Sequence, residues 1–224
     1  MQFDVPGRVS GATPDSASVK RIRAKLMGAA TPIRPLPSSG AMMALSVGVF
    51  VVMAILLTIP FGFQGFSRLT PGAAAIEYSA VLLLALALSG VVVGQMIPGS
   101  RRILGPVAGV VLSVVLLSAM ASLLFPVFEM RNFVRQGIPC LRLGTLCAIP
   151  AAGLIGLAMK RGFVTDTLQA AIAGGALAGL LGIGVLALHC PIVNASHIVA
   201  WHVAVIAVTS LLGAISGWCL SRFV

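Results

Sequence analysis

Acidic side chains are almost missing from this chain: it has five Asp and Glu among 224 residues, and charged residues of both signs make up only 9%. A soluble domain has about 25% charged residues, so water is not the main solvent of this protein. The hydrophobic residues, 58% of the chain, lie in continuous runs without the alternating pattern of barrel strands. Helices therefore remain as the structure that can satisfy the backbone in lipid.

Motifs for catalysis are missing as well. The sequence has no HExxH, no Gly-rich phosphate loop after a strand, and no Ser and His arranged with a buried acid. The apolar runs have almost no polar groups at mid-membrane, which argues against a transporter. Basic residues are not interleaved with aromatic ones in a patch, so direct nucleic-acid binding is not expected. We expect neither an enzyme nor a permanent cofactor.

Six apolar runs are each long enough to cross a hydrocarbon core of roughly 30 Å. Proline and glycine separate the runs, and Pro139 is expected to precede the fourth helix. The predicted fold class is all-α, an integral membrane bundle of six transmembrane helices formed by residues 40–224 and surrounded by the lipid bilayer. The runs are Ala41–Pro60, Ala73–Ile97, Leu104–Phe125, Leu141–Met159, Leu168–Leu188 and Ile198–Leu220.

Small residues recur four positions apart, as in Gly175 and Gly179. Such pairs let helices approach closely, which is how membrane bundles pack. We interpret them as packing positions inside one bundle rather than as a face for dimerisation.

Residues 1–39 form a polar N-terminal arm that cannot span a membrane. Within it, residues 18–27 are expected to form a short basic helix, because Val19, Ile22 and Leu26 fall on one face. Three prolines between Thr31 and Pro37 forbid a helix there and favour an extended chain. We expect the arm to be partly disordered.

The distribution of basic residues predicts that both termini lie in the cytoplasm, because cytoplasmic loops are enriched in Lys and Arg. The arm, the second and fourth loops and the C-terminus hold the larger group: Arg8, Lys20, Arg21, Arg23, Lys25, Arg34, Arg101, Arg102, Lys160, Arg161 and Arg222. The opposite side holds a smaller group: Arg68, Arg131, Arg135 and Arg142.

Two of the four cysteines are expected at the outer surface. Cys140 stands at the head of the fourth helix, and Cys190 lies in the loop after the fifth. Both face the oxidising side, where disulfides form. They could be a bridge or a reactive pair, or two unrelated membrane cysteines. Cys147 lies about two turns deeper on the face of Cys140, and Cys219 lies near the inner end of the last helix.

All three histidines, His189, His197 and His202, lie near the same outer surface. With the thiols they could bind a soft metal; a haem site is less expected. Alternatively, they anchor helix ends at the interface together with Trp201.

Glu77 is the only acidic residue within an apolar run. Charged groups there are costly and often functional. Near the outer end of the second helix, it is expected to pair with an outer arginine such as Arg135; a proton or ion relay is the alternative.

The second half of the chain carries distinctive short motifs: Pro139-Cys140, Ile149-Pro150, Met159-Lys160-Arg161-Gly162, Ala187-Leu188-His189-Cys190-Pro191 and Ile198-Val199-Ala200-Trp201-His202. The arm adds Ile33-Arg34-Pro35-Leu36-Pro37. With these motifs the chain resembles the NrsF family, the negative regulators of sigma F, which are six-helix membrane anti-sigma factors of bacteria. The resemblance extends over roughly Val19 to Gly217.

The resemblance implies a protein of the bacterial inner membrane that sequesters an extracytoplasmic-function sigma factor and releases it on a metal or redox signal. Cys140 and Cys190 would sense the signal and could bind a soft metal transiently. Independently of the resemblance, His189, His197, His202 and Cys147 are candidate auxiliary residues, and His197, His202 and Cys147 depart from the family's pattern. The sigma-binding residues would be Ile22, Arg23, Leu26, Ile33, Arg34, Pro35 and Leu36. A small-solute transporter or a membrane redox subunit is the alternative function.

Overall fold

The computed structural model describes residues 16–29, 37–97, 99–100, 104–128 and 132–222. The chain divides into two compact units, Met1–Pro35 and Leu36–Val224. In the first unit, the described part is helix α1 (Ser16–Ala29), which includes the segment 18–27. The side chains of Val19 and Ile22 on α1 are exposed.

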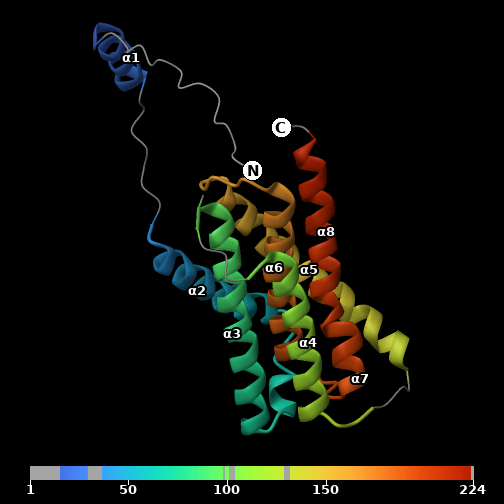
Figure 1. Cartoon of the computed structure of the whole chain (residues 1–224). Coiled ribbons are helices and arrows are strands. Elements are labelled where there is room, and N and C mark those ends of the chain that lie inside the picture. The colour runs from blue at the N-terminus through green and yellow to red at the C-terminus, as the bar shows by residue number, and fades with distance from the viewer. Residues whose placement is uncertain (1–15, 30–36, 98, 101–103, 129–131, 223–224) are drawn as a thin grey trace, which may run out of the picture. The chain divides into compact units, whose positions relative to one another are not determined.

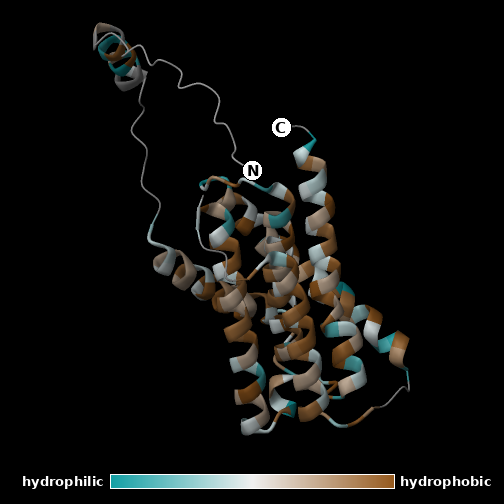
Figure 2. Cartoon of the chain, viewed as in Figure 1, coloured by the Kyte–Doolittle hydropathy of each residue, from teal (hydrophilic) through white to brown (hydrophobic). Residues whose placement is uncertain are grey.

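The second unit contains six long apolar helices able to span a membrane (Figures 1 and 2), as the sequence predicts. A 3-10 turn, η1 (Phe66–Arg68), lies in the loop between the first two spans. The first five spans are α2 (Ser39–Thr58), α3 (Pro71–Met96), α4 (Pro106–Leu124), α5 (Phe133–Met159) and α6 (Thr167–His189). The sixth is divided into α7 (Ala195–His197), the π-helical turn η2 (Ile198–His202) and α8 (Ala204–Ser221).

Side-chain caps fix where several of these helices begin. The Thr70 hydroxyl accepts a hydrogen bond from the Ala73 N–H, and the Asp166 carboxylate accepts one from the Gln169 N–H. Each cap satisfies one of the backbone N–H groups that the first turn leaves without a partner.

Helix α6 is the centre of the bundle, and almost all of its length is buried. Its glycines permit close contact with α8: a Cβ atom on Gly175 would overlap the Thr209 carbonyl oxygen, and one on Gly179 would overlap the Thr209 hydroxyl. The sequence-based prediction that this glycine pair packs helices together is confirmed.

Helix α5 begins at Phe133, eight residues before the start predicted from hydropathy. Pro139 and Pro150 both lie inside it, so the prediction of Pro139 as a turn residue was wrong. Proline is tolerated in membrane helices because neighbouring groups re-satisfy the freed carbonyls. As a result Cys140 lies inside α5, not at its head.

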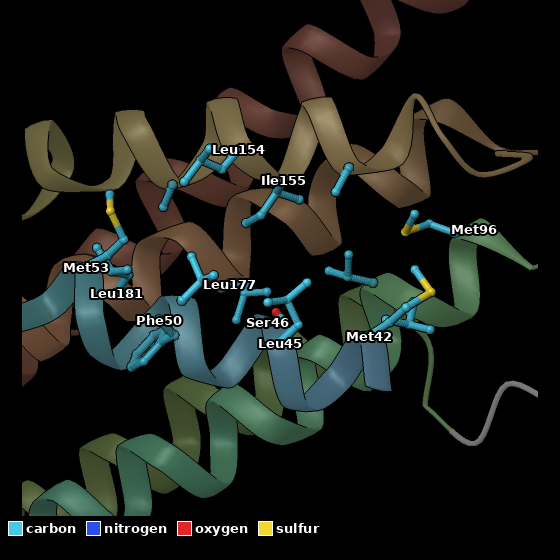
Figure 3. Close-up of a pocket in the computed structure, with 15 residues that line it drawn as sticks. Met42, Leu45, Ser46, Phe50, Met53, Met96, Leu154, Ile155, Leu177 and Leu181 are labelled. Carbon is cyan, nitrogen blue, oxygen red and sulfur yellow. The ribbon is translucent and has the colours of Figure 1, made fainter. Parts of the chain in front are cut away.

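Helix α2 packs loosely on the rest of the bundle. Only Phe50, Ala54 and Thr58 are buried on it, and the Ser46 hydroxyl contacts that of Ser89 on α3 at 2.9 Å. An apolar cavity of about 290 Å³ lies between α2 and its neighbours α3, α5 and α6. Figure 3 shows the side chains that line it. Its labelled lining residues are Met42, Leu45, Ser46, Phe50, Met53, Met96, Leu154, Ile155, Leu177 and Leu181.

Candidate functional site

The two predicted surface cysteines meet near one end of the bundle. Cys140 lies in α5, and Cys190 is the C-cap of α6. Their Sγ atoms are 3.6 Å apart, and both thiols are free. Of the other cysteines, Cys147 is buried in the core and Cys219 is exposed.

Two histidines complete the group. The Cys190 Sγ lies 3.5 Å from Nε2 of His197, and the rings of His197 and His202 meet edge to face with centroids 5.1 Å apart. One potential ligand atom from each of Cys140, Cys190, His197 and His202 lies within 4.8 Å of the others. We call these four residues the Cys/His cluster. Cys190, His197 and His202 are 5%, 2% and 3% exposed, so the cluster is sheltered from solvent.

Local sequence explains how the chain turns at this point. The Cys190 N–H donates to the Leu186 carbonyl at 2.7 Å, and Pro191 cannot continue the helix in the same way because it has no N–H. After the turn, the Asn194 side chain accepts a hydrogen bond from the His197 N–H at 2.7 Å and starts α7. These hydrogen bonds therefore fix where α6 ends, at Cys190, and where α7 begins, just before His197.

The π-helical turn η2 places His202 beside His197. The Val203 N–H donates to the Ile198 carbonyl at 3.0 Å, which is the five-residue hydrogen bond of a π-turn. In a regular α-helix, residues five apart are rotated by about 140° from each other. The π-turn removes most of that rotation, so both imidazoles face the two sulfurs.

Hydrogen bonding at the cluster stabilises one thiolate. The Cys140 thiol, and after it the His197 imidazole, donate hydrogen bonds toward Cys190 and lower the pKa of the Cys190 thiol below its usual range, and the nearby His202 acts in the same direction, although burial opposes them. Cys190 lies outside the membrane-spanning helices. It is therefore the thiol of this cluster with the more nucleophilic and metal-binding character.

The third histidine, His189, does not join the cluster. Its Nδ1 lies 3.2 Å from the Gly62 carbonyl oxygen, and its ring packs near Phe61. Gly65 donates its N–H to the His189 carbonyl. His189 thus ties the α2–α3 loop (residues 59–70) to the turn that contains Cys190.

Trp201 packs inside the protein, since a Cβ atom on Gly137 of α5 would overlap its indole and its ring lies 5.2 Å from that of Phe133. The burial of His197 and His202 favours a cluster over interfacial anchoring. Sequence reasoning missed the π-turn; the five-residue spacing of the histidines was the one signal for it.

Glu77 is buried, and within the described part of the chain it forms no ion pair with Arg135. On α1, Ile22 and Arg23 are exposed. The Leu26 side chain and the remaining predicted sigma-binding residues lie outside the described residues: Ile33, Arg34, Pro35 and Leu36.

Six apolar helices, of which α6 is central and the other five pack around it, with a Cys/His cluster near one end, define a multi-pass membrane protein. A family model described as NrsF, negative regulator of sigma F, matches residues 26–223. The chain belongs to this family, whose members regulate a sigma factor and are not a known enzyme family. No curated protein and no solved structure matched the chain.

Proposed function

We propose that this protein is a membrane-bound anti-sigma factor that holds an extracytoplasmic-function sigma factor at the bacterial cytoplasmic membrane. An envelope signal received by the Cys/His cluster releases the partner. The observation that carries this proposal is the family match, which extends from within α1 through all six helices. A sigma factor as partner follows from the family; its type, its side of the membrane and the signal are our proposal.

The charge distribution supports an orientation with the arm and the C-terminus in the cytoplasm. Within the bundle, α8 ends on the side away from α7, which contributes to the cluster (Figure 1). In this orientation the cluster lies at the envelope side of the membrane. It would therefore meet signals that arise outside the cytoplasm.

The arm is suited to bind a protein partner. Helix α1 has 14 residues and exposes Val19 and Ile22, and an isolated helix of this length is marginal in water. A partner that covers this apolar edge would stabilise it. Four exposed cations on the same helix would favour an acidic partner surface: Lys20, Arg21, Arg23 and Lys25.

Contacts within the bundle link the cluster to α2, the helix that follows the arm in sequence. The turn at Cys190 packs against Gly65 of the α2–α3 loop, and this loop continues directly from the end of α2. Because α2 buries few side chains and borders a cavity, we expect it to shift when the Cys190 turn changes.

A transporter or redox subunit is supported less well. Several buried hydroxyls in the spans donate to carbonyls of their own helix: Thr58 to Ala54, Ser113 to Gly109 and Thr209 to Val205. Side chains that satisfy themselves in this way do not form a polar path across the bundle. Substrate flux in proteoliposomes, or a chromophore in the purified protein, would favour the alternative.

The direct test is co-purification of a sigma factor with the full-length protein from its native host. Deletion of residues 1–37 removes the arm and should abolish capture. Deletion of residues 1–15, which precede both α1 and the family match, is the matched control and should retain it. If the full-length protein retains no sigma factor under any condition, the proposal fails.

A further inference from the structure

We propose that Cys140, Cys190, His197 and His202 together form one tetrahedral site for a divalent metal ion of the zinc class. This inference rests on the proposed function in one respect, since it names the stimulus that the cluster would receive. The binding chemistry itself follows from the four side chains. In this proposal His197 and His202 coordinate the metal directly, as the two cysteines do.

The spacing of the ligand atoms suits such a site. With Zn–S and Zn–N bonds of about 2.3 and 2.0–2.1 Å, the edges of a tetrahedron are about 3.8 Å between two sulfurs and about 3.6 Å between sulfur and nitrogen. The observed distances are 3.6 Å between Cys140 Sγ and Cys190 Sγ, and 3.5 Å between Cys190 Sγ and His197 Nε2. No pair among the four ligand atoms exceeds 4.8 Å.

Two thiols in simple contact would give a similar sulfur–sulfur distance, so the histidines decide the argument. His202 is 3% exposed, and its Nε2 has no hydrogen-bond partner within the described structure. An unsatisfied buried polar atom costs about 1–3 kcal/mol. A metal ion in the cluster gives this Nε2 atom a partner that the described side chains do not supply.

The backbone is arranged to bring both imidazoles to the sulfurs. His197 and His202 are five residues apart, a spacing that a regular helix would direct to different faces. The π-turn between them, held by the hydrogen bond from the Val203 N–H to the Ile198 carbonyl, brings the two side chains back to the same face. Such π-turns occur frequently at functional sites. A structural role in helix packing alone would not require the two rings to converge on Cys190.

Charge selects a divalent ion. When the metal binds, each of the two thiols releases its proton to water and its sulfur forms a bond to the metal, with no electron transferred. Two thiolates and two neutral imidazoles around a 2+ ion leave no net charge, which matters at a buried position. A monovalent ion would leave one negative charge uncompensated.

The donor atoms also exclude hard cations. Sulfur and imidazole nitrogen suit zinc and its heavier relative cadmium, whereas magnesium and calcium take oxygen ligands. We therefore expect Zn²⁺ and Cd²⁺ to bind, and Mg²⁺ and Ca²⁺ at the same concentration not to compete.

The test uses the full-length protein in detergent, reduced and stripped of metal. Zn²⁺ is titrated in competition with a chromophoric chelator, and Co²⁺ serves as a spectroscopic probe. One equivalent should bind, and Co²⁺ should show thiolate charge-transfer and tetrahedral ligand-field bands. His197→Gln and His202→Gln should each weaken Zn²⁺ binding at least tenfold. Cys219→Ser is the control, because Cys219 is an exposed thiol near the end of α8 and is not part of the cluster, and it should bind as the wild type does.

X-ray absorption of the zinc-loaded wild-type protein needs no variant and should find two sulfur and two nitrogen ligands. Failure of the reduced wild type to bind Zn²⁺, equal affinity in both histidine variants, or a shell without nitrogen would each overturn the four-ligand site. Sigma-factor capture is measured separately in excess chelator. Its absence together with a normal Zn²⁺ titration would refute the proposed function and leave the metal site standing.

Discussion

Gly65 donates its backbone N–H to the carbonyl oxygen of His189 at 3.1 Å. The contact is close on both sides, because a Cβ atom on Gly65 would lie 2.6 Å from the Ala187 carbonyl oxygen and 2.7 Å from that of Cys190. Both neighbours are backbone atoms and cannot rotate away. The α2–α3 loop and the Cys190 turn must therefore move together or separate.

Gly65→Ala should separate them. The added methyl group overlaps two carbonyl oxygens, a kind of overpacking that costs about 1–3 kcal/mol, and the loop should lift from the turn. If this contact transmits the signal, the expected result is expression from sigma-dependent promoters at least several-fold above wild type in unstimulated cells. The measurement is a transcriptional reporter in the native host.

Gly72→Ala is the control for that variant, because a Cβ atom added to Gly72, in the first turn of α3, would meet nothing within 4 Å. It should give wild-type expression. A Gly65→Ala protein that is present in the membrane at normal amounts and still represses and responds normally would rule out this route of coupling.

The contact of α6 with α8 predicts a stability difference between two glycine variants. Gly175→Ala should lower the free energy of unfolding by about 1–3 kcal/mol, because the methyl group overlaps the Thr209 backbone. Gly153→Ala in α5 meets nothing within 4 Å and should be neutral. Thermal unfolding in detergent, followed by circular dichroism, measures both; equal midpoints would contradict the packing argument.

Oxidation should join Cys140 to Cys190 in preference to any other pair. Their sulfurs need to approach by about 1.5 Å to reach disulfide length, whereas Cys147 is buried in the core away from the cluster. Mild oxidation of metal-free protein followed by peptide mass spectrometry should recover this bridge. Prior addition of Zn²⁺ should suppress it if both sulfurs are ligands; a bridge that forms equally fast with Zn²⁺ present would count against the shared site.

Hydropathy was sufficient to predict the six helices, because a span needs only length and apolar composition, and these are local properties. It failed at Pro139, since proline signals a break in water but is tolerated inside a membrane helix. The start of α5 at Phe133 therefore depends on surroundings that periodicity does not report.

The candidate site was predictable in part. The predicted topology places Cys140 and Cys190 at a similar depth in the membrane, and this made them a candidate pair. Depth alone does not predict which faces of α5 and α6 are in contact. The convergence of His197 and His202 depends on the π-turn, which has no compositional signature. The separation of His189 from the cluster likewise depends on the carbonyl of Gly62, a residue 127 positions away in a loop that carries no motif.

Sidedness is best tested at exposed positions, because Cys190 itself is buried and would label poorly from either side. Cys219 is exposed near the end of α8, and Ser67 is exposed in the α2–α3 loop. In a background with the other cysteines replaced by serine, Ser67→Cys should react with a membrane-impermeant maleimide in intact spheroplasts. Cys219 as the single cysteine should react only after permeabilisation. The reverse pattern would place the arm outside the cytoplasm, where it could not reach a sigma factor, and would contradict the proposed orientation.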